Sequence, residues 1–434
     1  MTGPGPAAPR DVQLATGAPL RLAPMLAKAG EGVVYGVQSR PGLVAKVFHP
    51  DLKDLTDKLG KVSAMIGSPP PDRVQANGFV VLTWPTAMIF DAGRPIGYLM
   101  PRIDTATAVE IHTMSNPSHR ADPLPNEPQW TRNATWGHLV NTAAKLCLAV
   151  EVVHRVDAVI GDFQERNILV SDTTQVTLVD CDSMQFIDVS GHQFLCGVGR
   201  PEFTAPELAG VDLRVAARAK SSDLFALAIH IHQLLMAGNH PFMRGAWTGG
   251  GEQPDALPLA RIGAWAGGPG SPLLTHPAAP PITFLPNEIQ RLFIRAFSEG
   301  ARNPSARPTA QEWRDALLRI QLTQCPRGLH QIPVTTAVCP WCAIDGGRAA
   351  RQQQQVQTGG VRQLPAPAPV TGPVRTGVRA PTNSRVARKN SLYATLNKHA
   401  TIIIAGLITF VVVVVILTIF IVWALLSGTS TFGG

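Results

Sequence analysis

The sequence predicts an α+β protein with a small strand-rich lobe, a larger helical lobe, a short metal-binding module and one membrane-spanning helix. Short runs rich in β-branched residues occur between residues 32 and 103, whereas helix-type apolar periodicity dominates from residue 136 to residue 322. A Cys-Pro-Trp-Cys motif follows at 339–342, and an uncharged, mainly apolar run follows at 402–426. This order of patterns indicates two packed lobes followed by two smaller C-terminal elements.

Composition and charge narrow the class of protein. Charged residues make up 16% of the chain, and its 39 glycines and 38 prolines exclude a coiled coil or a compact helical bundle. An apolar content of 45% excludes a fully disordered chain. Residues 343–400, with nine basic residues and one acid, account for the whole net charge of +8. Because this basic stretch lies in a predicted linker and not on a folded face, we expect no nucleic-acid partner.

The strand-rich lobe is expected over 18–103, after a Gly/Pro/Ala-rich segment (1–17) that we expect to be disordered. A helix pattern at 51–66 interrupts the strands. Strand-like runs occur at 32–37, 43–48, 79–84 and 96–103.

The helical lobe is expected over 104–322. Its longest helix pattern, at 136–156, repeats apolar residues every three or four positions. Two short strand-like pieces, at 167–170 and 175–180, predict a hairpin. Further helix patterns follow at 222–238 and 308–322.

Three polar residues around this hairpin carry the candidate chemistry. Asp162 and Asn167 are five positions apart, and Asp180 follows thirteen positions after Asn167. Phosphoryl transfer needs a carboxylate that orients the attacking hydroxyl, which suits Asp162, and hard oxygen ligands for Mg²⁺, which suit Asn167 and Asp180. It also needs a cation on the nucleotide phosphates, and Lys46 is the candidate. The pattern GDFQERNILV followed by TLVDCDS resembles the catalytic loop and metal-binding aspartate of the protein-kinase-like fold.

The resemblance implies that ATP binds to the small lobe. A glycine-rich turn, AGEGVVYGV (29–37), precedes Lys46, and its backbone N–H groups could cover phosphates. The alternative is that its glycines serve a tight hairpin turn. Residues 99–103 would link the lobes and pair with the adenine edge. Besides Lys46, the residues implied in nucleotide binding are Gly30, Gly32, Val34, Ala45, Met100 and Ile103.

Later motifs extend the resemblance through the helical lobe and imply three structural residues. Glu207 would form an ion pair with Arg307, and Asp223 would be a buried carboxylate that organises the lobe. The motifs are PEFTAPEL (201–208), SSDLFALAIHIHQLLMAGNHPF (221–242) and ARPTAQEW (306–313).

Several positions depart from the kinase pattern. Gly161 stands where an arginine usually precedes the catalytic aspartate, and Gln164 where a lysine often assists the transferred phosphate. Cys181 and Asp182 replace the aromatic residue and the glycine that usually follow the metal-binding aspartate. Because Gly161 cannot bind a phosphorylated activation loop, we expect that phosphorylation of segment 183–204 is not needed for activity.

The usual carboxylate partner of the phosphate-binding lysine is also missing. No glutamate occurs between Glu31 and Glu110. We expect Asp57, on the predicted helix, to pair with Lys46, with Asp54 as the second candidate. The alternative is that both aspartates are solvated helix charges.

A cysteine-rich segment at 323–345 predicts a structural zinc ribbon. Thiolates two residues apart chelate Zn²⁺ on a tight turn, and a second pair of ligands completes the tetrahedron. The alternative is a set of free cysteines in a capping turn. The expected ligands are Cys325, His330, Cys339 and Cys342.

The C-terminal segments predict a membrane anchor. Residues 346–400 are rich in Gln, Pro, Gly and Arg and are expected to be a flexible basic linker. The apolar run within 401–426 is long enough to cross a bilayer, and residues 427–434 would form an external tail. Basic residues lie only on the near side of the run, so we expect a tail-anchored protein of the cell membrane with its kinase domain in the cytoplasm. No signal-peptide pattern opens the sequence.

These features together resemble bacterial, eukaryotic-like Ser/Thr protein kinases, and are similar to those of the tellurite-resistance-associated phosphorylation triad. The motifs PEFTAPEL and VDCDS are the basis of that resemblance. It implies a protein substrate, ATP and Mg²⁺ as cofactors, and as partners a PP2C-type phosphatase and a von Willebrand A-type protein. Two alternatives stay open: a pseudokinase scaffold that binds nucleotide without turnover, and a small-molecule kinase.

Overall fold

The computed structural model describes residues 11–359 of the chain. The predicted membrane-spanning helix, the terminal tail and most of the predicted linker lie outside the described residues. None of the helices between residues 11 and 359 combines the length and apolar character that a membrane span requires.

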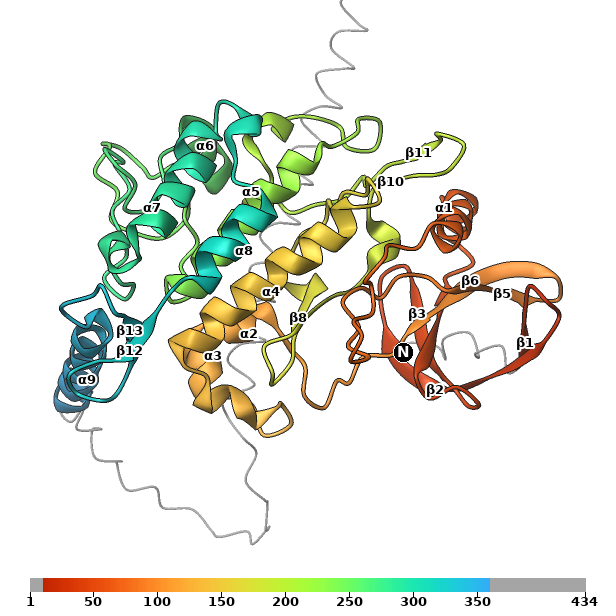
Figure 1. Cartoon of the computed structure of the whole chain (residues 1–434), viewed down its shortest axis with the longest axis horizontal. Coiled ribbons are helices and arrows are strands. Elements are labelled where there is room, and N and C mark those ends of the chain that lie inside the picture. The colour runs from red at the N-terminus through yellow and green to blue at the C-terminus, as the bar shows by residue number, and fades with distance from the viewer. Residues whose placement is uncertain (1–10, 360–434) are drawn as a thin grey trace, which may run out of the picture. The chain divides into compact units, whose positions relative to one another are not determined.

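A closed barrel of antiparallel strands forms the N-terminal part of the described chain (Figure 1). In spatial order the strands are β1 (Asp11–Leu14), β2 (Pro19–Lys28), β3 (Gly32–Val37), β4 (Leu43–Phe48), β6 (Arg94–Pro101) and β5 (Ala87–Asp91). β1 pairs with both β2 and β5, and the second pairing closes the barrel. The expectation of disorder over 1–17 is therefore wrong for residues 11–14, whose backbone is hydrogen-bonded on both sides.

Side chains alternate across the barrel wall, and this alternation decides what faces the candidate site. Ala45 and Leu99 belong to the cluster inside the barrel. Successive strand residues point to opposite faces, so Lys46 and Tyr98 lie on the outer face. Helix α1 (Leu55–Gly67) covers that outer face and packs Val62 into a cluster with Tyr98. The predicted helix at 51–66 is thus confirmed, with its start at Leu55.

The predicted strand at 79–84 is wrong. Leu82 and Trp84 are fully buried in the core of the helical part, and Leu82 forms an isolated bridge to Leu178. The Trp84 indole N–H donates to the carbonyl oxygen of Met65 at 2.8 Å. An apolar run alone does not distinguish a strand from a buried connection, and here the run connects α1 to β5 (Ala87–Asp91) while packing into the core of the helical part.

The helical part is built around α4 (Trp136–His154), which packs against α5 (Lys220–Leu235) and α8 (Ala310–Leu318) (Figure 1). These three helices confirm the helix predictions within a few residues. The other helices of this part are α2 (Ile111–Ser115), α3 (Pro117–Ala121), α6 (Ala256–Ile262) and α7 (Asn287–Ile294). Its strands are β7 (Val109–Glu110), β8 (Ile168–Val170), β9 (Val176–Leu178), β10 (Phe186–Ile187) and β11 (Gln193–Phe194).

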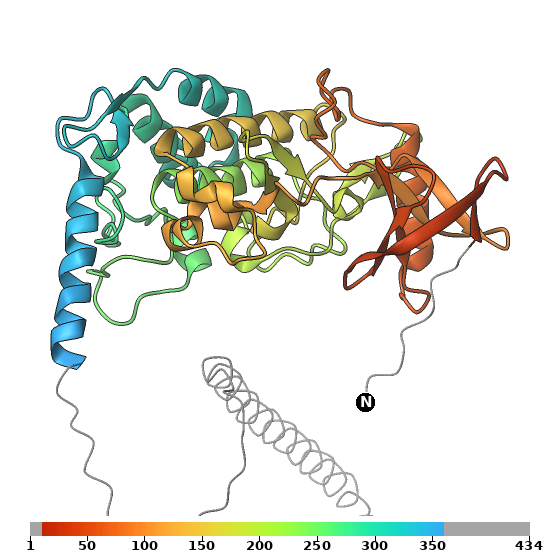
Figure 2. The same ribbon diagram turned by 90° about the horizontal axis from the view of Figure 1, so that it is seen from below.

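A small hairpin, β12 (Leu322–Gln324) with β13 (Gln331–Pro333), follows α8 and leads into α9 (Pro340–Gly359) (Figure 2). The side-chain oxygen of Gln331 accepts hydrogen bonds from the Thr135 hydroxyl at 2.7 Å and the Gly137 amide at 3.2 Å. These bonds fix the hairpin to the start of α4. Because α9 continues to Gly359, the first part of the predicted flexible linker is helical.

Candidate active site and metal centre

A buried aspartate on α5 organises the loop that carries Asp162. Asp223 is 2% exposed and accepts hydrogen bonds from the backbone amides of Ile160 at 2.7 Å and Gly161 at 3.0 Å. His154 lies 2.9 Å from the same carboxylate. A carboxylate that holds two consecutive amides fixes the backbone conformation directly before Asp162.

The Asp162 carboxylate is held by two neutral amide side chains. Gln164 donates to Asp162 Oδ2 at 2.7 Å, and Asn167 donates to the same oxygen at 3.2 Å and to the Asp162 carbonyl at 2.9 Å. Because Asn167 uses its amide nitrogen for these bonds, its Oδ1 remains the atom that suits a Mg²⁺ ligand.

Lys46 and Asp180 meet although 134 residues separate them in the sequence. The Lys46 Nζ lies 2.7 Å from Asp180 Oδ1 and also bonds both carboxylate oxygens of Asp182, at 2.9 and 2.8 Å. The side chains of Lys46 and Asp182 are 4% and 3% exposed, whereas that of Asp180 is 39% exposed. Asp180 is therefore the carboxylate that solvent or a metal ion can reach.

The electrostatics of this cluster keep the lysine charged. Burial alone would lower the pKa of Lys46, but the carboxylates of Asp182 and Asp180 hold it above its ordinary value. Burial alone would likewise raise the pKa of Asp182, but Lys46 and the Tyr98 hydroxyl hold it below its usual value. Burial and the neighbouring Asp182 charge raise the pKa of Asp180, although Lys46 opposes this shift. A cation near Asp180 would offset that cost.

The structure contradicts the prediction that Asp57 pairs with Lys46. Asp57 lies exposed on α1, as the solvated-charge alternative expected. Asp54 lies 3.5 Å from Lys58, which also bonds Glu31 at 2.7 Å. The reason is that the carboxylate is supplied by the segment after Asp180, and α1 contributes no acid to the cluster.

The residues implied in nucleotide binding fall on two faces of the barrel. Val34 is the cross-strand neighbour of Lys46, and Met100 lies two positions after Tyr98 on the same strand face. Ile103 is half-buried just beyond β6. Ala45 belongs to the cluster inside the barrel and faces away from Val34 and Lys46, because adjacent strand residues point to opposite faces. Its role in nucleotide binding stays a prediction.

Strand geometry explains one of the two glycines of the turn. A Cβ on Gly32 would lie 2.4 Å from the Val47 carbonyl oxygen, so close approach of β3 and β4 requires glycine there. Gly30 lies exposed in the turn between β2 and β3, with open space around its Cα. The close approach of the strands accounts for Gly32, and the role of Gly30 in covering phosphates stays a prediction.

A buried arginine ties the segment after Asp180 to the loop that carries Asp162. Arg218 is 7% exposed, and its guanidinium donates to the carbonyl oxygens of Gly161 at 2.6 Å, of Cys196 at 3.1 Å and of Val198. Gly161 has a φ of +72°, and a Cβ there would lie 2.7 Å from the Cys196 sulfur. The site therefore has no room for an arginine side chain at position 161.

Glu207 and Arg307 form the ion pair that the motifs implied. The guanidinium donates to both carboxylate oxygens, at 2.7 and 2.6 Å, and also to the carbonyl oxygens of Ser221 and Gly300. The Arg307 side chain is fully buried. The pair links the 201–208 segment to the turn before α8.

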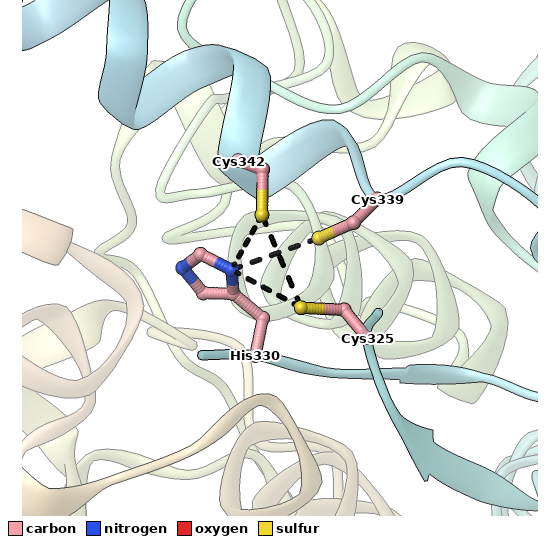
Figure 3. Close-up of side chains that lie close together, drawn as sticks. All are labelled: Cys325, His330, Cys339 and Cys342. Atoms are coloured by element: carbon pink, nitrogen blue, oxygen red, sulfur yellow. Dashed lines mark hydrogen bonds between the residues drawn. The ribbon is translucent and has the colours of Figure 1, made fainter. Parts of the chain in front are cut away.

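The four predicted zinc ligands converge at the junction of β12, β13 and α9 (Figure 3). All four donor atoms lie within 4.8 Å of one another. The His330 Nδ1 lies 3.5 Å from the Cys342 sulfur, 3.6 Å from that of Cys339 and 4.0 Å from that of Cys325. Three sulfurs and one imidazole nitrogen at this spacing form a cluster that could bind Zn²⁺.

The surroundings of the cluster favour metal binding. The other His330 nitrogen, Nε2, lies 3.0 Å from the carboxylate of Asp345, a contact that orients the ring with Nδ1 toward the sulfurs. Burial alone would raise the pKa of Cys325, but the backbone amides of His330, Leu329 and Arg327 lower it to about 6, whereas burial and the neighbouring thiols of Cys339 and Cys325 raise the pKa of Cys342 to about 11.

Four residues of these sites were not predicted as such from the sequence: Tyr98, Arg218, Asp345 and, as the partner of Lys46, Asp182. Asp182 carried a usable signal, because it is a second acid two positions after Asp180. Asp345 follows the last cysteine by three positions, within reach of a metal-binding histidine.

Comparison with known proteins supports a kinase. No protein-family model matches the chain. The chain is 30% identical over 341 residues, 76% of its length, to "Protein kinase YegI" of Escherichia coli (strain K12). It is 31% identical over 331 residues, 74% of its length, to "Protein kinase YegI" of Escherichia coli O157:H7. The chain spans about half the length of these curated relatives, 49% and 48% respectively, and is distantly homologous to them.

Proposed function

We propose that this chain is a Ser/Thr protein kinase that transfers the γ-phosphate of ATP to protein hydroxyls. The observation that carries the proposal is the convergence of Lys46 with Asp180, at 2.7 Å, beside a loop in which Asn167 holds Asp162. A cation, a solvent-accessible carboxylate and an oriented second carboxylate are the parts that phosphoryl transfer needs.

Each residue has one role in this proposal. Lys46 binds the nucleotide phosphates, and Asp180 and Asn167 hold Mg²⁺, which neutralises the charge on the transferred group. Asp162 orients the attacking hydroxyl and accepts its proton. The amide donors on Asp162 Oδ2 keep the carboxylate from rotating away from the hydroxyl. We also propose that the fold is the bilobal kinase fold, with the barrel as its small lobe.

A nucleotide-binding scaffold without turnover is the second candidate. Gln164 favours it, because a neutral amide cannot supply the positive charge that a lysine brings to the transferred phosphate.

Binding and transfer measured on the same samples separate the two. For the kinase, wild type should bind Mg-ATP and label a protein substrate, whereas Asp162→Asn should still bind Mg-ATP with at most about one hundredth of the transfer rate. Binding by both proteins with no transfer by either would favour the scaffold.

The membrane anchor and the partners are further proposals. The apolar run at 402–426 and the basic stretch before it support anchoring at the cell membrane with the kinase domain in the cytoplasm. If the anchor is real, deletion of residues 401–434 should move the protein from the membrane fraction to the supernatant and leave transfer intact. Resemblance alone supports a PP2C-type phosphatase and a von Willebrand A-type protein as partners, and copurification with the full chain tests them.

A further inference from the structure

The phosphate-binding lysine needs a carboxylate partner that holds it in place, and no acid on α1 reaches it. We propose that Asp182 is the positioning residue for Lys46 and that Tyr98 holds Asp182 in turn. The inference rests on the proposed kinase function and goes beyond it, because it assigns the support of Lys46 to the segment after Asp180 and not to helix α1.

The contacts are those of a fixed partner. Asp182 bonds the Lys46 Nζ through both oxygens, at 2.9 and 2.8 Å, and accepts the Tyr98 hydroxyl hydrogen bond at 2.7 Å. Both carboxylate oxygens are therefore engaged, and the side chain is 3% exposed. A charge buried this deeply is stable only when it is paired and hydrogen-bonded, as it is here.

The barrel brings the lysine and the tyrosine together. Lys46 on β4 and Tyr98 on β6 are directly opposite in the antiparallel register, so their side chains leave the barrel wall side by side. The aromatic ring of Phe48 lies 5.7 Å from the Lys46 Nζ and 5.9 Å from the Tyr98 ring. The outer barrel face thus presents one cation and one hydroxyl donor to the same carboxylate.

Helix α1 contributes a buried positive charge near Lys46, and not the acid that was expected there. Its buried charged residue is Lys61, which donates to the Leu195 carbonyl at 3.4 Å. Asp57 lies exposed on the same helix. The positive charge of Lys61 acts favourably on the Asp182 carboxylate, which comes from the segment beyond Asp180.

The turn that joins Asp180 and Asp182 gives the two carboxylates different surroundings. Asp180 has a φ of 59° and precedes the single 3-10 turn Cys181–Ser183. One carboxylate stays accessible for Mg²⁺, and the other is buried against Lys46. The position of the lysine is therefore coupled to the conformation of the metal-binding segment and not to the position of α1.

A double-mutant cycle on the full-length chain tests the assignment. The variants are Asp182→Asn, Lys46→Met and the double variant, and the readouts are the KM for ATP, kcat and the Mg²⁺ dependence. Asp182→Asn should raise the KM for ATP by about tenfold, because the ammonium is no longer held on the phosphates. If Asp182 acts through Lys46, the double variant should be no worse than Lys46→Met alone.

Two milder variants and one control accompany the cycle. Tyr98→Phe removes only the hydroxyl and should raise the KM for ATP by about threefold to tenfold. Asp182→Glu keeps a carboxylate and should recover most of the loss in Asp182→Asn. Asp57→Asn, an exposed change on α1, should behave as wild type.

Specific outcomes overturn the inference. Additive losses in the double variant, or wild-type kinetics in Asp182→Asn, would show that Asp182 does not act through Lys46. A changed Mg²⁺ dependence with an unchanged KM for ATP would make Asp182 a metal ligand instead. If wild type binds ATP without transfer, the same cycle is measured on the Kd for ATP. A wild-type chain that neither binds nor uses ATP would refute the kinase proposal, and this inference with it.

Discussion

Replacing one cysteine of the predicted zinc ribbon tests the zinc prediction quantitatively, through the zinc content per chain. Tetrahedral Zn²⁺ with bonds of about 2.3 Å to sulfur and about 2.0 Å to nitrogen requires sulfur–sulfur separations of about 3.8 Å and sulfur–nitrogen separations of about 3.5 Å. Cys325 and Cys342 have a sulfur–sulfur distance of 3.9 Å, and the sulfur–nitrogen distances to His330 are 3.5, 3.6 and 4.0 Å. These four separations are therefore within about 0.5 Å of those that the ion requires.

We expect about one zinc per chain by elemental analysis of the purified full-length protein. Cys339→Ser should reduce this to below about 0.1, because three remaining ligands cannot close a structural tetrahedron. It should also lower the melting temperature, since the ion would tie the β12–β13 hairpin to α9. Cys147→Ala, a buried cysteine in α4 outside the cluster, should keep its zinc. Wild-type protein without zinc, or Cys339→Ser with full zinc content, would refute this reasoning.

Three other features give measurable expectations. Arg218 already bonds the loop segment to the Gly161 carbonyl, so phosphatase treatment should leave the transfer rate unchanged; a silenced enzyme would contradict this. Glu207→Gln leaves the buried Arg307 without its counter-charge and should cost about 2–4 kcal/mol in urea unfolding; a loss under about 0.5 kcal/mol would contradict it. Burial lowers the pKa to about 4, 4 and 3 at His230, His232 and His240. The unfolded chain binds more protons below about pH 6.5, so stability should fall from pH 6.5 toward pH 4 by up to about 1.4 kcal/mol per pH unit per histidine, and His232→Gln should flatten that slope.

Sequence patterns predicted those features whose residue types and spacing are themselves characteristic of the structure. Apolar periodicity located α4, α5 and α8, and cysteine spacing located the metal cluster. The Glu207–Arg307 pair was implied by the resemblance of two motifs to the kinase pattern. In each case the residue types themselves restrict the structure.

Pairings that depend on tertiary geometry were not predictable in this way. The lysine partner was sought on the nearest helix, but it is Asp182, 136 residues away from Lys46, in a turn that begins with Asp180 at positive φ. Ala45 and Val34 were both implied in nucleotide binding, but the alternation of strand residues places them on opposite faces of the barrel wall. β1 is a short strand of mixed polarity, DVQL, that gains its stability by pairing with both β2 and β5.

Transfer of label from radiolabelled ATP to protein by the purified full-length chain, in the presence of Mg²⁺, tests the central claim most directly. If Asp180 holds the metal ion, wild type should transfer label and Asp180→Ala should lose at least about a hundredfold of the rate. Asp172→Ala, which changes an exposed aspartate in the β8–β9 turn, should transfer as wild type does. Equal transfer by wild type and Asp180→Ala, or no transfer by wild type, would contradict the assignment of this site as a kinase centre.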